Sequence, residues 1–493
     1  MTGSGLSERF LQSRRTFWIV LCLTTLLFAV GNLPWRLDDY DQGKQAFTSF
    51  EMMKEGHWFY QRTPNEHAAT KPPLVGWISA GIFAATRSWA IAWRLPSFLC
   101  AIALLAFLYF AARNAYGQIA GLVAMCAFGL NLLSLRLATL VRTDMPLALV
   151  IFLLGWQIWD RIRKDQPWGM HDRVRAFILL TASMLIKGPI VCAFLLPAIV
   201  FFEWRRRSRP TRASAWCGWL PWLGAFTIFI FWVVGGILFA PHFFNDVIMR
   251  EFLGRFGETV HRPQPFYFYL PQLLHKFAPW SILAIAFVAL KWSAEKIGLG
   301  ERWRRASPEI VWLLLWSIGG LIVMSLIPSK RVDRIFPIVP PLCLLLAALF
   351  ARVTSQEELR SRAMRWSALS VIFAFVFSTG YVAAKVVDAF RHDRGALGRF
   401  GHYVRTEADA HGWQYDVIGR AQEGLLLYLE RPRFVSPEEA VERWNAGAID
   451  AVIAPEEERP RLLHELEGSI PSRIRSWGEN DKETPRYIFL TRS

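Results

Sequence analysis

A polar loop runs from Asp38-Asp39-Tyr40-Asp41-Gln42 to Thr70-Lys71-Pro72-Pro73-Leu74, directly after the first apolar segment of the chain. The three carboxylates at its start and Lys71 near its end lie next to sequence that is apolar enough to enter a bilayer. A charged side chain there costs about 2.5 kcal/mol or more. A loop that only joins two helices has no need of these charges, so we interpret it as the functional face of a membrane protein.

Composition supports a polytopic helical membrane protein. Of the 493 residues, 53% are hydrophobic, and apolar runs long enough to cross a bilayer recur along the chain. The formal net charge is +16, with Lys and Arg concentrated in short loops between the apolar runs. This pattern is typical of cytoplasmic loops that contact anionic lipid, so we expect no nucleic-acid partner.

A parity argument gives the predicted topology. The apolar runs lie at 16–33, 74–86, 94–112, 118–135, 144–160, 174–188, 189–204, 217–240, 271–291, 309–326, 334–352 and 367–387. The basic loops at 160–175, 205–209, 291–305 and 352–365 can all be cytoplasmic, together with the N-terminus, only if one run does not cross. The shortest run, 74–86, is the one we expect to lie at the interface or to re-enter, which leaves about 11 spans.

The last part of the chain differs in composition. From 388 to 493, short apolar pieces at 415–418, 450–454 and 487–490 alternate with helical stretches. This alternation predicts a small soluble α/β domain. We therefore divide the chain into an all-α membrane domain at 1–387 and a domain at 388–493 on the outer side.

The acidic loop is expected to begin with an amphipathic helix over 42–54, because Ala46, Phe47, Phe50 and Met53 recur at helical spacing. Such a helix is suited to lie flat on the membrane surface. Asp38, Asp39 and Asp41 precede or begin it, and one of them is expected to act as its N-terminal cap. Three caps for one helix are not needed, so at least one carboxylate is expected to have a catalytic or acceptor-binding role.

Two further motifs lie at the same predicted face. Two prolines follow Lys71 and present it rigidly at a helix start, which suits a phosphate as well as a lysine reaching lipid headgroups. Asp144, in Arg142-Thr143-Asp144-Met145-Pro146, is either a second functional carboxylate or a helix-capping residue followed by an early proline.

Several basic residues are also predicted on the outer face, against the positive-inside tendency. Together they indicate an anionic phosphate in a cavity. The candidates for donor-phosphate binding are Lys71, Lys187, Lys330 and Arg331, with His261, Arg262 and Arg334 as further candidates beside Asp38 and Asp39. His261 alone is more typical of a structural histidine than of a metal ligand, since no second ligand occurs at a diagnostic spacing.

These motifs resemble the bacterial lipid A 4-amino-4-deoxy-L-arabinose transferases and the wider superfamily of protein O-mannosyltransferases. Gly56-His57-Trp58 followed by Lys71-Pro72-Pro73-Leu74 is similar to the family's first-loop pattern, and counting back aligns Asp41 with its leading Asp. Three later stretches resemble its second acidic site, its Lys-Gly-Pro turn and its late Lys-to-Pro motif: 144–147, 187–189 and 329–341.

The resemblance implies a polyprenyl-phosphate-linked sugar as donor, a lipid or glycolipid acceptor such as lipid A, and inverting transfer on the outer, periplasmic face of a bacterial inner membrane. Asp41 and Asp144 would be the catalytic pair. The alternatives are the same donor with a protein or another envelope glycan as acceptor, and a lipid or sugar transporter. The family's Glu before Lys-Pro-Pro, which helps to hold a metal, is Thr70 here. We therefore expect no required cofactor, with His261 as the residue in the corresponding region for a divalent metal.

Overall fold

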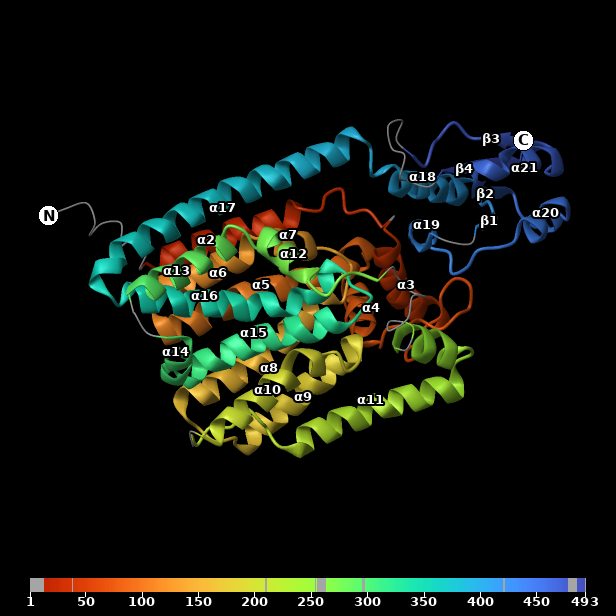
Figure 1. Cartoon of the computed structure of the whole chain (residues 1–493). Helices are drawn as coiled ribbons and strands as arrows, with labels where there is room; N and C mark the ends of the chain where they lie inside the picture. The colour runs from red at the N-terminus through yellow and green to blue at the C-terminus, as the bar shows by residue number, and fades with distance from the viewer. Residues whose placement is uncertain are drawn as a thin grey trace.

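The computed structural model describes residues 13–37, 39–208, 211–252, 254, 263–294, 298–419, 422–477 and 486–492. A large bundle of long helices forms one part, and a small mixed sheet with short helices forms the other (Figure 1). The helices of the bundle and its loops are α2 (Arg14–Val30), α3 (Tyr40–Glu55), α4 (Leu74–Thr86), α5 (Trp89–Tyr116), α6 (Gln118–Gly129), α7 (Leu132–Leu137), α8 (Asp144–Lys164), α9 (Met170–Lys187), α10 (Val191–Arg206), α11 (Trp219–Phe239), η1 (Phe244–Phe252), α12 (Tyr269–Lys276), α13 (Trp280–Ala294), α14 (Leu299–Arg305), α15 (Pro308–Leu326), η3 (Val332–Ile338), α16 (Val339–Thr354) and α17 (Glu357–Arg391).

The fold is that of a polytopic membrane protein, as the composition predicted. Every apolar run expected to span is largely helical, although 118–135 and 271–291 are each divided between two helices. Among the described residues, six helices are long and apolar enough to cross a membrane, or seven if the bent pair α12 and α13 counts as one span. The run at 74–86 forms the 13-residue helix α4, which is shorter than a span requires.

The run at 118–135 is shorter than the sequence suggested. It forms the 12-residue helix α6, which stops at Gly129, and the chain then restarts as α7. Asn131 causes the break, because its side chain accepts from the Ser134 backbone N–H at 2.9 Å and donates to the Ala127 and Phe128 carbonyls. An asparagine that satisfies both helix ends favours a turn over a continuous span.

Close helix packing holds the bundle together. At Gly155 in α8, an added Cβ would lie 2.3 Å from the ring of Trp316 in α15. The neighbouring Trp312 donates its indole N–H to the Gly155 carbonyl at 3.1 Å. A small residue here lets two large aromatic side chains approach the α8 backbone, which is how membrane helices commonly pack.

The basic loops gather at one end of the bundle, as the charge pattern predicted. The Asp165 carboxylate accepts from the Ala213 backbone N–H at 3.0 Å, and Arg205 donates to the Trp303 carbonyl at 2.8 Å. Arg352 also contacts Ser307. The loops that carry the acidic residues and α4 lie at the opposite end, next to the sheet (Figure 1).

The expectation that α3 lies flat on the membrane is wrong. Its apolar residues Ala46, Phe47 and Phe50 are buried inside the protein. They join one hydrophobic cluster with residues of α5 and of α19 (Glu423–Leu429) in the C-terminal part. An amphipathic pattern alone does not distinguish a lipid surface from a protein surface, and here the sheet-bearing part supplies the apolar partner.

The C-terminal part is a small α/β unit, as predicted. Its sheet has the order β1-β2-β4-β3, with β1 and β2 parallel and the other pairs antiparallel. The strands are β1 (Tyr415–Val417), β2 (Ala451–Pro455), β3 (Ser469–Pro471) and β4 (Tyr487–Arg492), and the helices are α18 (Ala396–His411), α19, α20 (Pro437–Asn445), η4 (Glu456–Glu458) and α21 (Arg459–Glu465). β3 was not expected. Helix α17 continues to Arg391, and the boundary at 387/388 stays a prediction.

Candidate functional site

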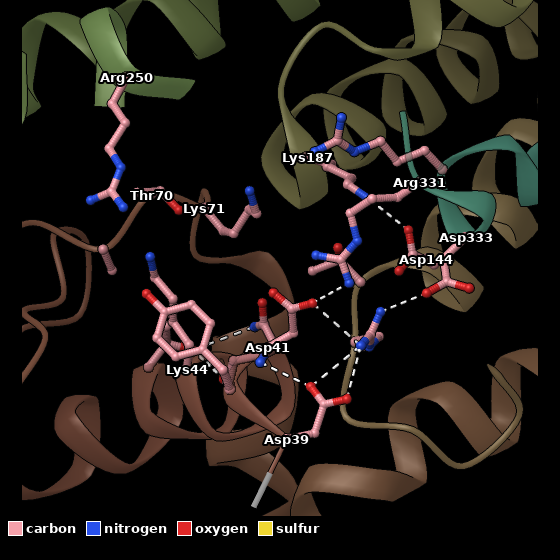
Figure 2. A pocket seen from close by; sticks show the side chains of 17 residues that line it. Asp39, Asp41, Lys44, Thr70, Lys71, Asp144, Lys187, Arg250, Arg331 and Asp333 are labelled. Carbon is pink, nitrogen blue, oxygen red and sulfur yellow. Dashed lines mark hydrogen bonds and ion pairs between the residues drawn. The ribbon is translucent and has the colours of Figure 1, made fainter. Parts of the chain in front are cut away.

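A pocket of about 310 Å³ opens where the first loop meets the ends of α8, α9 and η3 (Figure 2). Its lining is densely charged. The acidic residues are Asp39, Asp41, Asp144 and Asp333, and the basic residues are Lys44, Lys71, Arg142, Lys187, Arg250, Arg331 and Arg334. Among the described lining residues, the cationic side chains outnumber the carboxylates, so the pocket favours an anionic ligand.

The start of α3 places two of the carboxylates. Asp39 is the N-cap, and its side chain accepts from the backbone N–H groups of Asp41 and Gln42. Asp41 lies in the first turn, where the helix dipole favours a negative charge. The buried Gln42 accepts from the Val141 N–H at 3.2 Å, which fixes α3 against the loop that carries Arg142.

Five side chains from three separate segments form what we call the Arg142 cluster: Asp39, Asp41, Arg142, Arg331 and Asp333. The buried Arg142 guanidinium lies 3.2 Å from Asp39, 3.3 Å from Asp41 and 2.7 Å from Asp333. Arg331 forms a short ion pair with Asp41. Alternating charges therefore fix the two arginines and the Asp41 carboxylate in position (Figure 2).

The cluster keeps Asp41 ionised. Burial alone would raise the pKa of Asp41, but the hydrogen bond and charge of Arg331, with the charges of Arg142 and Lys71, outweigh it and lower this pKa. The pKa of Arg331 is raised in turn, because its contacts with Asp41 and the charges of Asp333 and Asp144 outweigh its burial. An Asp with a lowered pKa is a weak proton acceptor and a strong fixed negative charge.

Asp144 and Lys187 form a second ion pair. The Lys187 ammonium donates to the Asp144 carboxylate at 2.5 Å, and both side chains are nearly buried. The capping alternative for Asp144 is wrong, because Thr143 is the N-cap of α8, no side chain caps this helix, and Asp144 is its first residue. Much of the charge on Lys187 is compensated by Asp144, which leaves less of it available to an anion.

The other side of the pocket carries Lys71, Lys44 and Arg250 (Figure 2). Lys71 precedes the two prolines that start α4, and Lys44 projects from α3 near the Tyr40 ring. Arg250 is supplied by η1. Within the described residues, neither Lys44 nor Arg250 forms an ion pair with a carboxylate.

The structure brings together most of the residues selected from sequence. Asp39, Asp41, Lys71, Asp144, Lys187, Arg331 and Arg334 all line the pocket. Lys330 does not: its ammonium turns away and donates to the Gln264 carbonyl at 2.9 Å, and burial lowers its pKa. Asp38, His261 and Arg262 lie outside the described residues.

Arg142, Asp333, Lys44 and Arg250 were not selected from the sequence. Arg142 stands two residues before Asp144, and its proximity to a selected motif was the signal that could have identified it. Asp333 lies between two selected arginines in the same way. Lys44 and Arg250 carried no local signal, because only the folded chain brings α3 and η1 to one pocket.

The described part of the chain offers no evident metal site. No group of three or more His, Cys, Asp and Glu side chains among them is arranged to hold one. His67 and Asp246, which lie 3.2 Å apart, form a pair rather than a ligand set. Thr70 occupies the position where the resembled family carries its glutamate, and its hydroxyl is a much poorer ligand than a carboxylate.

Comparison with known proteins agrees with this architecture. Residues 70–235 match the family model described as dolichyl-phosphate-mannose-protein mannosyltransferase. Two curated relatives are undecaprenyl phosphate-alpha-4-amino-4-deoxy-L-arabinose arabinosyl transferases. The protein from Aeromonas salmonicida is 28% identical over 73% of this chain and 64% of its own length. The protein from Edwardsiella ictaluri is 25% identical over 69% and 60%. The matched part of this chain thus spans less than two thirds of these relatives.

A solved structure shows the same fold. The crystal structure of ArnT from Cupriavidus metallidurans bound to undecaprenyl phosphate superposes with a TM-score of 0.68 at 17% identity, covering 96% of this chain and 97% of that one. The apo structure of the same protein gives a TM-score of 0.63. The chain is thus similar in sequence to this mannosyltransferase family over residues 70–235 and to the aminoarabinose transferases over about 70% of its length, and it shares the fold of ArnT.

Proposed function

We propose that this protein is a membrane glycosyltransferase that transfers a sugar from a polyprenyl-phosphate donor to an envelope acceptor. The observation that carries the proposal is one pocket in which Lys71, Lys44 and Arg250 face the ionised Asp41 and its arginines. A phosphate and a polar sugar can then be held side by side at the end of a membrane bundle. The names of the relatives point to undecaprenyl phosphate as the lipid carrier.

The chemistry is a direct displacement at the anomeric carbon. An acceptor oxygen forms a bond to this carbon while the bond from carbon to the phosphate oxygen breaks, so the configuration inverts. The donor is a phosphodiester with one negative charge, and the departing polyprenyl phosphate gains a second. Lys71, Lys44 and Arg250 bind the departing form more strongly than the donor, and such differential binding accelerates the reaction.

Asp41 acts mainly as a fixed charge. Its lowered pKa makes it a poor general base, while its carboxylate can accept hydrogen bonds from sugar or acceptor hydroxyls and oppose the positive charge that develops at the anomeric carbon. If the acceptor is a phosphate, as in lipid A, no proton has to be removed at all. Asp144 holds the Lys187 ammonium at the pocket by an ion pair, and Arg331 holds the Asp41 carboxylate in place.

The position and the charge of the pocket also indicate the membrane face at which the reaction takes place and the partners that it uses. The pocket lies at the end of the bundle opposite the basic loops, which would place it on the periplasmic face of a bacterial inner membrane. The acceptor is lipid A or another glycolipid, with protein or another envelope glycan as the alternative. The proposed mechanism requires no metal, because the basic side chains supply the positive charge that the leaving phosphate needs.

The test is transfer of a radiolabelled sugar from a synthetic polyprenyl-phosphate donor to extracted lipid A by purified protein in detergent. Asp41→Asn is expected to remain folded and to lose transfer. Asp160→Asn, which removes a carboxylate that pairs with Arg163 and Lys164 at the opposite end, is the matched control and keeps it. Full transfer by the Asp41→Asn variant would refute the role of Asp41.

The transporter alternative has less support. Transporter sites lie near the bilayer midplane between broken helices, whereas the charged pocket here lies at the end of the bundle. Movement of a labelled lipid-linked sugar across vesicles without formation of a new glycosidic bond would favour transport over transfer.

A further inference from the structure

A second, smaller cavity of about 170 Å³ lies behind the Arg142 cluster. It is enclosed by the chain leading into α3, the first turns of α5, the α7–α8 connection and the end of α17. Asp39 of the Arg142 cluster lines both cavities, and Arg136 in the second cavity contacts Asp333 of the cluster, so the two cavities adjoin. The proposed transfer reaction does not use this second cavity.

The second cavity carries a strong excess of positive charge. Among the described residues, five cationic side chains line it, against the two carboxylates of Asp39 and Asp388. The cations are Arg36, Arg94, Arg136, Lys385 and Arg394. They come from four separate parts of the chain, so the clustering is produced by the fold and not by one basic stretch.

The two carboxylates are already engaged. Asp39 caps α3 and faces Arg142 on the side of the first pocket. Asp388 lies 3.0 Å from both Arg394 and His392. Arg136 lies 3.4 Å from Asp333, which Arg142 also contacts at 2.7 Å. The acidic groups near this cavity are therefore shared among several bases.

Two of the cations have no carboxylate partner within the described part of the chain. Arg94, only 6% exposed, donates to the carbonyls of Ala90 and Trp35 and lies over the Trp35 ring. The partly buried Lys385 donates to the Asn32 side-chain oxygen at 2.5 Å. Carbonyl and amide oxygens satisfy hydrogen bonds, but they supply no negative charge to the two cations, which have no anionic partner among the described residues.

We propose that this second cavity is a binding site for a phosphate group, separate from the pocket that holds the donor. A phosphate offers the charge that Arg94 and Lys385 lack, and its several oxygens can accept from guanidinium and ammonium groups converging from different directions. The phosphate belongs either to a membrane lipid headgroup or to a soluble phosphate compound. The proposal does not depend on glycosyl transfer, because it rests only on the charges around this cavity.

The test is thermal unfolding of the purified full chain in detergent while inorganic phosphate replaces chloride at constant ionic strength. All proteins carry Lys71→Met, which weakens phosphate binding in the first pocket. A ligand that binds only the folded state raises Tm in a saturable way. We expect this rise in the parent, its loss in Lys385→Gln, and its retention in Arg391→Gln, which removes an exposed charge from the same helix outside the cavity.

Lys385→Gln keeps a donor for Asn32 while removing the charge, so it separates the two roles of the lysine. Its Tm without phosphate should equal or exceed that of the parent, because one of several repelling cations is gone. A folded Lys385→Gln variant that keeps the full phosphate response would overturn the proposal, whatever its Tm without phosphate. If Lys385→Gln does not fold, Arg394→Gln removes another cation of the cavity and must weaken the response.

A second arm separates the two sources of phosphate. The same proteins are reconstituted into phosphatidylcholine nanodiscs with and without phosphatidic acid. A Tm increase with phosphatidic acid that Lys385→Gln abolishes assigns the site to a lipid headgroup. A response to inorganic phosphate alone assigns it to a soluble phosphate. No response to either probe in the parent would refute the site.

Discussion

Arg331 and Asp41 lie 290 residues apart in the sequence and form an ion pair in the pocket. The pair joins the loop before α16 to the first turn of α3, and Arg142 contacts the same carboxylate from a third segment. The charge state of Asp41 therefore depends on parts of the chain that no local motif connects.

Replacing Arg331 by Met is expected to move the acid limb of the activity profile to higher pH. Burial favours the neutral form of Asp41, and Arg331 is the largest opposing influence, so its loss raises the pKa of Asp41. The stability that the ionised carboxylate contributes is present above its unfolded pKa and disappears as pH falls through the folded pKa. In the variant this loss of stability begins at higher pH.

The measurement is kcat/KM against pH, with Arg331→Lys as the conservative variant. An unchanged acid limb would contradict the assignment.

Replacing Lys71 by Met is expected to lower kcat by about 10²–10³-fold, the usual effect of removing one group that stabilises developing negative charge. KM should change less, because the donor carries one negative charge less than the departing lipid phosphate. Lys54→Met is the control, since Lys54 lies in the same loop but pairs with Glu430 outside the pocket. A large rise in KM at unchanged kcat would mean that Lys71 only anchors the donor.

Breaking the Asp144–Lys187 pair from one side is expected to destabilise the protein by about 3–5 kcal/mol, because a nearly buried charge is left without its partner. Asp144→Asn and Lys187→Met should each lower Tm. The double variant should lose less than the two single losses combined, because no unpaired charge remains. Additive losses in thermal unfolding would show that the two residues act independently.

Gly155→Ala is expected to cost about 1–3 kcal/mol, because the new methyl group would overlap the Trp316 ring. Gly81→Ala in α4 is the matched control. A Cβ there meets nothing within 4 Å, so the substitution should be neutral or stabilise the helix by about 0.5–1 kcal/mol. Equal Tm values for the two variants would argue against close packing of α8 on α15.

The sequence was informative where one strong physical preference decides the outcome. Apolar runs located the spanning helices, and the loop charges grouped the basic connections at one end because burying a charge in lipid is costly. Asp41, Lys71 and Asp144 could be found because each stands at a helix start beside a proline or a capping position.

The sequence was a poor guide where one residue pattern suits two different surroundings. The apolar stripe of α3 would fit lipid as well as α19, and only the folded chain distinguishes them. Lys187 and Lys330 both resembled Lys71, and the sequence did not show that Lys187 is paired within the pocket whereas Lys330 points out of it. Their partners, Asp144 and the Gln264 carbonyl, come from segments whose proximity is a tertiary property. The break at Asn131 was missed because side-chain bonds there override the apolar run.

The packing of α3 against α19 has a consequence for the order in which the protein matures. The ribosome makes Asp41 long before α19, and the apolar face of the Asp41 helix finds α19 only after residues 423–429 have been synthesised. The hydroxyl of Tyr428 also accepts from the Leu37 N–H at 2.9 Å, just before α3 begins. The nascent chain thus acquires a correctly placed Asp41 only after α19 has been made, and a product terminated before α19 would insert into the membrane without an ordered site.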